Sequence, residues 1–233
     1  MKKISQTKAF ALLALIMVLA LLLLPSQTVL GKLLEVVMFD AVELASVDST
    51  GTNANSDVNT VAINGDGQFV AFHTNASVLV TGVNGTYQDV FVKDMSSGAI
   101  EHVSAANGGG LGNGNSTDPS ISANGRYVAF LSQASNLVTG DTNGLQDIFI
   151  YDRDLNTVSL VSLAADGITQ ANGSSNTPKV CGNGSHVVFS SNATNLVPTD
   201  TNGMEDVFIK NISTGAVELI STASDGTTQG NGI

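Results

Sequence analysis

The sequence predicts an all-β protein made of β-propeller blades. Three observations predict it: a unit of about 58 residues occurs three times, each copy contains signals for four short strands, and the part of the chain after the N-terminal segment shows no helical period. Three four-stranded repeats and an orphan N-terminal strand follow from this pattern. Because complete propellers usually have about four to eight blades, we expect a partial or truncated propeller of the six-bladed type.

The repeat is defined by three landmarks in one register. The first is the set of hexapeptides GQFVAF, GRYVAF and GSHVVF at residues 67–72, 125–130 and 184–189, which are offset by 58 and 59 residues. The second is a tetrapeptide with the same offsets, which begins at Asp89, Asp147 and Asp206. The third is an apolar residue followed by serine at residues 103–104, 161–162 and 220–221. Equal offsets at independent landmarks indicate a structural repeat.

Each repeat is expected to form four strands, which in the middle copy cover about residues 119–122, 126–132, 147–151 and 158–163. Asn124-Gly125 is a typical hairpin turn between the first two strands. The second strand is apolar on both faces, with the sequence YVAFL at residues 127–131. A sheet with one face in water would alternate apolar and polar residues, so this strand predicts a sheet covered on both sides. Blades packed face to face around an axis provide that cover.

The repeat also sets the expected domain boundaries. The blades are predicted at about residues 58–104, 118–163 and 177–222, within one propeller domain at residues 32–233. Residues 42–47 read VELASV and match the fourth strand of the last blade, VELIST at residues 217–222, so they predict an orphan fourth strand before the first blade. The apolar faces and unpaired edges at the ends of such a stack predict self-association.

The N-terminus predicts export. Lys2, Lys3 and Lys8 precede an apolar run at residues 9–24, and a short polar segment follows up to Gly31. This order is typical of a secretory signal peptide, which we place at residues 1–31. An uncleaved N-terminal membrane anchor is the alternative, and we expect no other contact with a membrane. The mature protein is therefore expected in the periplasm, at the cell surface or in the medium.

The charge balance excludes one class of partner. The chain has a formal charge of −11, and without residues 1–31 it keeps 6 basic and 20 acidic residues, or 6 − 20 = −14. So acidic a protein repels phosphate backbones, and we expect no nucleic-acid partner. The single cysteine, Cys181, cannot form an intramolecular disulfide, and it occupies the position of Ser122 in the preceding repeat.

The motifs of the repeat, taken together, resemble a known family. GRYVAF at residues 125–130 is followed by NLV at residues 136–138, DTNG at residues 141–144 and DIF at residues 147–149, an order similar to that of TolB-like, WD-repeat-like bacterial β-propellers. The resemblance covers about residues 42–233 and implies the propeller fold. It implies no single function, because such relatives include periplasmic scaffolds, sugar-related enzymes and propellers attached to peptidases.

One pair of loops is a candidate ion site. The pattern Asp-x-Asn-Gly-x-x-Asp occurs twice, at Asp141, Asn143 and Asp147 and at Asp200, Asn202 and Asp206. In the interpretation that we favour, the leading Asp and the Asn bind backbone N–H groups in Asx-turns and the last Asp braces the start of a strand. In the other interpretation, these oxygens bind calcium. The first repeat has Val83 at the leading position, so no calcium is expected there.

No catalytic set is evident in the sequence. His73, His102 and His186 fall at non-equivalent positions of the repeat, and neither a nucleophile elbow nor a zinc-protease motif is present. We therefore expect no catalytic and no cofactor-binding residues, and we predict a non-catalytic binding or scaffold module for a protein or carbohydrate ligand. The alternative is the propeller portion of an exported hydrolase- or lyase-associated enzyme whose catalytic part lies outside this chain.

Overall fold

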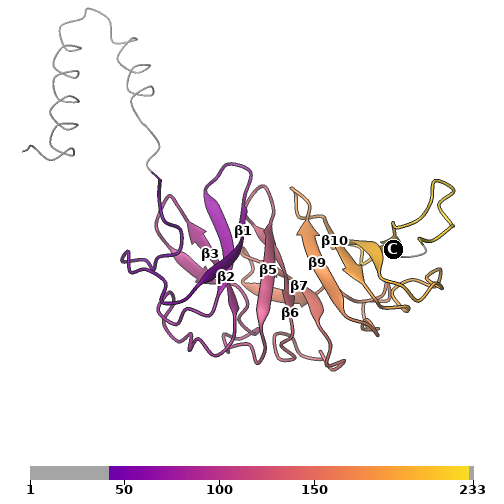
Figure 1. Cartoon of the computed structure of the whole chain (residues 1–233), viewed down its shortest axis with the longest axis horizontal. Coiled ribbons are helices and arrows are strands. Elements are labelled where there is room, and N and C mark those ends of the chain that lie inside the picture. Colours follow the sequence, from indigo (N-terminus) through magenta and orange to yellow (C-terminus); the bar gives the residue numbers. More distant parts are fainter. Residues whose placement is uncertain (1–41, 231–233) are drawn as a thin grey trace, which may run out of the picture. The chain divides into compact units, whose positions relative to one another are not determined.

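The computed structural model describes residues 42–230, whose strands form three four-stranded antiparallel sheets (Figure 1). The first sheet consists of β1 (Val58–Ile63), β2 (Phe69–Thr74), β3 (Asp89–Asp94) and β4 (Ile100–His102). The second consists of β5 (Ser116–Ile121), β6 (Tyr127–Ser132), β7 (Asp147–Asp152) and β8 (Thr157–Leu160). The third consists of β9 (Ser175–Val180), β10 (His186–Ser191), β11 (Asp206–Asn211) and β12 (Val217–Leu219).

These sheets confirm the predicted all-β class and the three repeats of four strands. Strands that are neighbours in a sheet are also consecutive in the sequence, and we call the sheets blades 1, 2 and 3. No helix occurs among residues 42–230, so this part of the chain has no helix that is long and apolar enough to cross a membrane. The predicted signal peptide or anchor at residues 1–31 lies outside the described residues.

The register within each blade is fixed by one pair of phenylalanines. Phe130 lies opposite Phe149 in blade 2, and the corresponding pairs are Phe72–Phe91 and Phe189–Phe208. The rings of these pairs stack with centroids 5.8, 6.0 and 5.9 Å apart, and all six side chains are buried. Because a slip of one residue would move every side chain to the opposite face, these buried pairs hold the middle strands in register.

The blades pack face to face, as the apolar faces of the second strands predicted. Every residue of β6 after Tyr127 is buried, with Val128 and Phe130 in the core toward blade 1 and Ala129 and Leu131 in the core toward blade 3. Both faces of blade 2 are therefore covered by neighbouring blades of the same chain.

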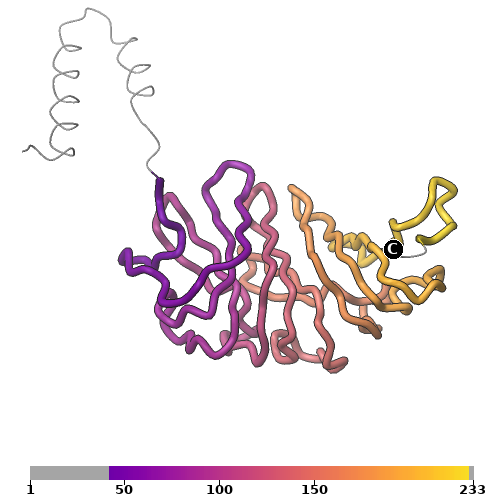
Figure 2. The backbone as a smooth tube through the Cα atoms, in the orientation of Figure 1, coloured from indigo at the N-terminus to yellow at the C-terminus, as the bar shows by residue number. Residues whose placement is uncertain are grey.

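The turns between the first and second strands join the blades along one end (Figure 2). The N–H of Gly65 in blade 1 donates to the carbonyl of Ala123 in blade 2 at 3.0 Å, and the N–H of Ala123 donates to the carbonyl of Gly182 in blade 3 at 2.9 Å. Backbone hydrogen bonds therefore connect three equivalent turns and set the spacing of the blades.

The first strand of each blade contains a bulge that the sequence did not predict. The pairing register shifts once in β1, β5 and β9, and a residue without glycine's freedom has a positive φ there: Thr60 at 33°, Asp118 at 51° and Thr177 at 50°. Such backbone is uncommon for any residue but glycine, and it is most disfavoured for a β-branched residue such as threonine. Its recurrence at one repeat position indicates that the packing of the blade imposes it.

The predicted orphan strand at residues 42–47 is not formed. Only Val47 takes part in a bridge, to Asn53, just as Leu163 bridges to Gln170 after β8. The repeat register was therefore right, but a fourth strand must pair with a third strand, and each of β3, β7 and β11 already pairs with its own fourth strand. The Nζ of Lys93 holds this segment instead, donating to the carbonyl of Val47 at 3.1 Å.

Candidate functional site

The last aspartate of each loop lies buried at the start of the third strand. Asp147 Oδ1 accepts a hydrogen bond of 2.5 Å from Ser162 on the chain that follows β8, and Ser162 Oγ in turn accepts the N–H of Ile148 at 3.2 Å. Asp89 with Ser104 and Asp206 with Ser221 repeat this arrangement. The expected bracing of the third strand by this aspartate is therefore present in all three blades.

The asparagine of each loop closes an Asx-turn. Asn143 Oδ1 accepts the N–H of Leu145 at 2.9 Å, and Asn202 Oδ1 accepts the N–H of Met204 at 2.9 Å. The other end of the amide is also used, since Asn143 Nδ2 donates to the carbonyl of Ala171 at 3.2 Å. The Asx-turn interpretation thus accounts for Asn143 and Asn202.

A turn alone does not explain the burial of the leading aspartates, although the backbone at Asn143 and at Asn202 approaches them as in an Asx-turn. Asp141 and Asp200 are 7% and 5% exposed, and they lie beside Asp147 and Asp206, which are 0% and 2% exposed. Burial raises the pKa of Asp141, and the charge of Asp147 raises it further, while a backbone hydrogen bond at Asn143 opposes the rise. Burial and the charge of Asp206 likewise raise the pKa of Asp200. Each loop therefore brings two carboxylates together out of water.

Several oxygens of these carboxylates have no hydrogen-bond partner. They are Asp147 Oδ2, Asp206 Oδ2 and both oxygens of Asp200. Among residues 42–230, no lysine, arginine or histidine forms an ion pair with these aspartates. Within the same residues no group of three His, Cys, Asp or Glu side chains is arranged around a metal position, so an ion here would need amide, carbonyl or water oxygens as well.

A glutamine from the following link holds each loop in place. Gln170 accepts the N–H of Thr142 at 3.2 Å and donates to the carbonyl of Gly140, so its side chain is hydrogen-bonded to the backbone on both sides of Asp141. Gln229 binds Thr201 and Thr199 in the same way around Asp200. The position of the leading carboxylate is therefore set by the segment that leads into the next blade.

Blade 1 lacks both the leading aspartate and the glutamine that holds it. Val83 stands at the leading position and lies in an apolar cluster with Leu111, which occupies the place of Gln170. Asp89 is retained, and its Oδ1 lies 3.0 Å from Nε2 of His102, whose counterpart in blade 2 is Leu160. The contact of His102 with Asp89 was not predicted from the sequence. The signal was present, because His102 and Val83 are both departures from the repeat in the same blade.

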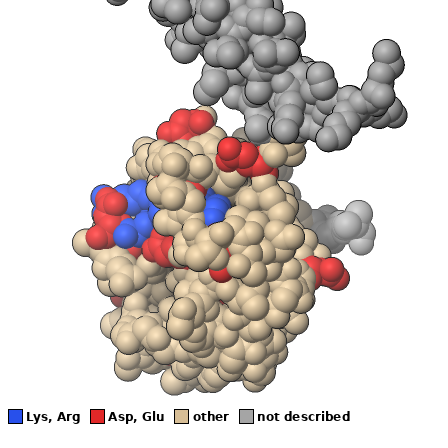
Figure 3. Space-filling model, turned by 90° about the vertical axis from the view of Figure 1, so that its left-hand side faces the viewer, with Lys and Arg blue, Asp and Glu red and all other residues tan. Residues whose placement is uncertain are grey.

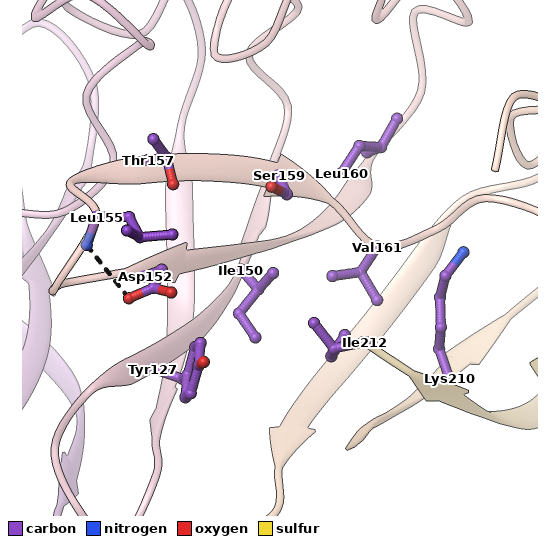
Figure 4. A pocket seen from close by; sticks show the side chains of 10 residues that line it. All are labelled: Tyr127, Ile150, Asp152, Leu155, Thr157, Ser159, Leu160, Val161, Lys210 and Ile212. Atoms are coloured by element: carbon purple, nitrogen blue, oxygen red, sulfur yellow. Dashed lines mark hydrogen bonds between the residues drawn. The ribbon is translucent and has the colours of Figure 1, made fainter. Parts of the chain in front are cut away.

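A separate pocket of about 230 Å³ lies between blades 2 and 3 (Figure 4). Tyr127, Ile150, Leu155 and Ile212 form much of its apolar wall, and Lys210 lies at one side. Its remaining lining residues are Asp152, Thr157, Ser159, Leu160 and Val161.

The corresponding place between blades 1 and 2 is filled by larger side chains. There Tyr151 and Arg153 stand where blade 3 has Lys210 and Ile212. The guanidinium of Arg153 lies 4.1 Å from the centre of the Phe69 ring. The pocket therefore exists because blade 3 has smaller residues at these positions.

Two arginines of blade 2 are paired with acids, whereas Lys210, which lines the pocket, donates to the carbonyl of Leu163. Arg126 binds Asp152 at 2.7 Å, and Arg153 binds Glu101 at 2.8 Å. On the face shown in Figure 3, the Lys and Arg side chains lie next to Asp and Glu side chains. This face therefore presents no continuous basic surface for a polyanion.

One chain of hydrogen bonds has the composition of a catalytic triad but the wrong polarity. Ser185 Oγ lies 2.7 Å from Nδ1 of His186, and Nε2 of His186 lies 3.2 Å from Nδ2 of Asn211. Asn211 Oδ1 accepts the N–H groups of Ser213 and Thr214, so its Nδ2 must be the donor to Nε2. Nδ1 then carries the proton and donates to Ser185, whereas a general base would accept from it.

The thiol of Cys181 lies beside this chain of hydrogen bonds and is half-buried. Burial raises its pKa, but hydrogen bonds from Ser185 and from the backbone of His186 outweigh burial and leave the pKa lowered. Sγ accepts the N–H of His186 at 3.1 Å, which is a structural contact of the turn. The sulfur has no histidine base directed at it.

The comparisons with known proteins concern the fold. No protein-family model and no curated protein matches the chain. Similar solved structures include TolB from Acinetobacter baumannii, with 18% identity, a TM-score of 0.46 and coverage of 72% of this chain and 33% of that one. TolB from Agrobacterium tumefaciens has 18% identity, a TM-score of 0.44 and coverage of 72% and 49%.

A third similar structure is the β-propeller domain of the Trilobed protease from Pyrococcus furiosus, with 12% identity, a TM-score of 0.45 and coverage of 72% and 43%. The chain thus spans less than half the length of each of these three proteins. Strand order, the repeated register and the packing of each sheet on the next identify residues 58–230 as consecutive β-propeller blades.

Proposed function

We propose that this chain is an exported, non-catalytic β-propeller module that binds or organises a protein or carbohydrate ligand. The observation that carries the proposal is that the polar residues common to the blades are used inside the blades. Asn113 and Ser135, for example, exchange two hydrogen bonds of 3.0 and 2.8 Å, and the pairs Asn55–Ser77 and Asn172–Thr194 repeat them. Residues that recur for structure in this way leave binding to the positions that differ between blades.

The pocket between blades 2 and 3 is such a position. It depends on Lys210 and Ile212, which replace the larger Tyr151 and Arg153 of the preceding blade. An apolar wall with a few polar groups at its rim is typical of a ligand site. The acidic composition and the pairing of Arg126 and Arg153 with acids favour a neutral or cationic ligand over a polyanion.

Binding is tested by screening the chain from Lys32 against arrays of peptides and of neutral oligosaccharides. The informative variant is Ile212→Arg, which introduces the residue that fills this place in blade 2. We expect it to abolish binding, whereas Ile168→Arg, at an exposed loop position outside this pocket, should retain it. No binding to either array, or equal binding by both variants, would contradict a ligand site in this pocket.

The absence of catalysis is tested with a fluorophosphonate probe, which labels activated serine nucleophiles. The chain should stay unlabelled, because His186 donates to Ser185 and does not accept its proton. Labelling that disappears in Ser185→Ala would instead establish a hydrolase.

Export is tested by fusing residues 1–31 to an alkaline phosphatase that is active only outside the cytoplasm. We expect activity from the native segment and none from a Leu15→Arg variant, because a charge in the apolar run blocks its recognition as a signal. Equal cytoplasmic retention of both fusions would refute export. The size of the product on a gel distinguishes a cleaved signal from an uncleaved anchor.

A further inference from the structure

We propose that blades 2 and 3 each bind one calcium ion, the first between Asp141 and Asp147 and the second between Asp200 and Asp206. The two loops have the same residue pattern, and each joins its carboxylates at the start of a third strand. This inference does not depend on the ligand of the propeller.

Both loops contain buried carboxylate oxygens that have no hydrogen-bond partner. Asp147 is fully buried, yet its Oδ2 has no hydrogen-bond partner, and both oxygens of the 5% exposed Asp200 lack one. A buried carboxylate without hydrogen bonds or an opposite charge is strongly unfavourable. In each loop a second, almost fully buried aspartate, Asp141 or Asp206, belongs to the same site, so a cation placed there would satisfy the unpartnered oxygens.

In blade 1 the buried carboxylate at the start of the third strand has a side-chain partner. This blade keeps the strand-starting Asp89 but supplies a local partner, His102, at 3.0 Å. It also lacks the second carboxylate, since Val83 takes that place and packs in an apolar cluster near Leu111. Blades 2 and 3 have two aspartates and a leucine at the histidine position, so neither contains a side-chain cation for its carboxylates. A bound ion would give these carboxylates a partner, as Nε2 of His102 is a partner for Asp89 in blade 1.

Hydrogen bonds fix the backbone of these loops in the absence of an ion. Gln170 bonds to the backbone on both sides of Asp141, and Asn143 ties the same loop to Ala171. The carboxylate is therefore fixed before any ion binds, which lowers the entropic cost of binding. Because Gln170 and Ala171 belong to the link into blade 3, an ion at Asp141 would also fasten that link to blade 2.

The oxygens available select the ion. Two carboxylates and nearby amide and carbonyl oxygens are hard ligands, which suit calcium. No set of three His, Cys, Asp or Glu side chains is present within residues 42–230, so the usual ligand set of zinc is not formed there. Calcium tolerates irregular coordination completed by water, and modules outside the cell bind it with dissociation constants of roughly 10⁻⁴ to 10⁻³ M.

The test is the number of ions bound. Equilibrium dialysis of the chain from Lys32 with radioactive calcium, at neutral pH and in about 0.15 M KCl to screen nonspecific attraction, should give two ions per chain. Asp141→Asn should leave one, and Asp141→Asn with Asp200→Asn should leave none. The control is Asp154→Asn, which removes the same charge at a side chain that is 64% exposed and should leave two.

A second variant distinguishes loss of the calcium site from loss of the folded structure. The triple variant Asp141→Val, Gln170→Leu and Leu160→His gives blade 2 the residues that blade 1 has at these three positions. This variant should keep the circular dichroism spectrum of the native chain and bind one ion. A native chain that binds no calcium would show that the carboxylates share a proton instead and would overturn the proposal. Two ions bound by the double aspartate variant or by the blade-1-like variant would overturn it equally.

Discussion

At the end of the first strand of each blade, one side chain accepts the N–H group that opens the second strand. Ser122 Oγ accepts the N–H of Tyr127 at 2.9 Å, and Cys181 Sγ accepts the N–H of His186 at 3.1 Å. Asn64 performs the same task in blade 1. Three different residues therefore meet one requirement of the turn, and the sulfur of Cys181 serves in place of a hydroxyl.

We expect Cys181→Ser to be nearly neutral, with a free energy of unfolding within about 0.5 kcal/mol of the native chain. Cys181→Val removes the acceptor for the N–H of His186 and should cost about 1–3 kcal/mol. Urea unfolding followed by circular dichroism measures both values. Equal losses for Ser and Val would show that the packing of the sulfur, rather than its hydrogen bond, is what matters.

Lys210 is a buried amine whose titration should be visible in the stability. It is 6% exposed, and its Nζ donates to the carbonyl of Leu163 at 2.7 Å. Burial lowers its pKa from 10.5 to about 8, with the charge of Asp166 opposing the shift. Between these values the unfolded chain binds more protons than the folded chain, so the free energy of unfolding should rise with pH across that window.

Lys210→Met should remove this dependence. We expect the native chain to gain on the order of 1–3 kcal/mol from about pH 8 to pH 10.5, since one pKa unit corresponds to about 1.4 kcal/mol. The gain should be absent in Lys210→Met and retained in Lys179→Met, a lysine in an exposed position. Urea unfolding at a series of pH values measures it. If the free energy of unfolding changes with pH in the same way in the native chain and in Lys210→Met, the assignment of the shifted pKa to Lys210 is wrong.

The hairpin turns of blades 2 and 3 each fit against a ring on the second strand of the blade before. Gly184 has φ of 75°, and a Cβ atom there would overlap the ring of Tyr127. A Cβ at Gly125 would likewise overlap the ring of Phe69. Gly67 has a similar φ of 80°, but its Cβ would meet only Ile63 Cδ1 at 3.8 Å, so blade 1 provides a natural comparison.

Alanine substitutions should separate backbone strain from this close approach. Gly67→Ala should cost about 1–2 kcal/mol for the left-handed backbone alone. Gly184→Ala and Gly125→Ala should cost a further 1–3 kcal/mol or so, because the ring must move. Urea unfolding of the three variants checks the difference. Equal costs at all three positions would mean that the rings shift freely and that the turns do not position the blades.

At the level of strands, the repeat and the hydrophobic pattern predicted most of the fold. The doubly apolar segment at residues 127–131 predicted a sheet covered on both faces, and β6 is covered on both faces. The bulges could not be predicted, because a positive φ is rare for the β-branched Thr60 and Thr177 and because nothing in the local sequence marks Asp118 as the residue that adopts it. Residues 42–47 showed the right sequence for a fourth strand, but local sequence does not reveal whether a third strand is free to pair with it.

In the candidate site, too, the sequence predicted the local turn but not the contacts made by distant parts of the chain. The spacing of Asp141, Asn143 and Asp147 predicted either an Asx-turn or a calcium-binding loop, and the turn at Asn143 is present. The burial of Asp141 could not be predicted from the loop itself, since it depends on Gln170, 29 residues later in the chain, folding back over the loop. The pairing of Asp89 with His102 depends in the same way on two strands that are brought together only in the sheet.

Across the whole set of blades, one face differs from the others in burial. In blade 2 the residues that face blade 3 are buried, among them Ile148 and Ile150. Their counterparts in blade 3 are Val207 and Ile209, which lie only half-buried on β11, where buried and half-buried residues alternate. The apolar surface that a following blade would cover is thus present on blade 3, with Ile220 beside it at 45% exposed.

A second copy of the chain is the occupant that we expect for this face, because the face has the chemistry that the protein's own blades pack against. Light scattering on the chain from Lys32 should therefore show a dimer or a larger species. Val207→Glu with Ile209→Glu places two charges on the face and should give a monomer with an unchanged circular dichroism spectrum, since desolvating the charges is costly. Ile168→Glu, at a loop position that is 82% exposed, is the matched control and should leave the assembly intact. A native chain that stays monomeric at high concentration would show that this face is stable in water on its own.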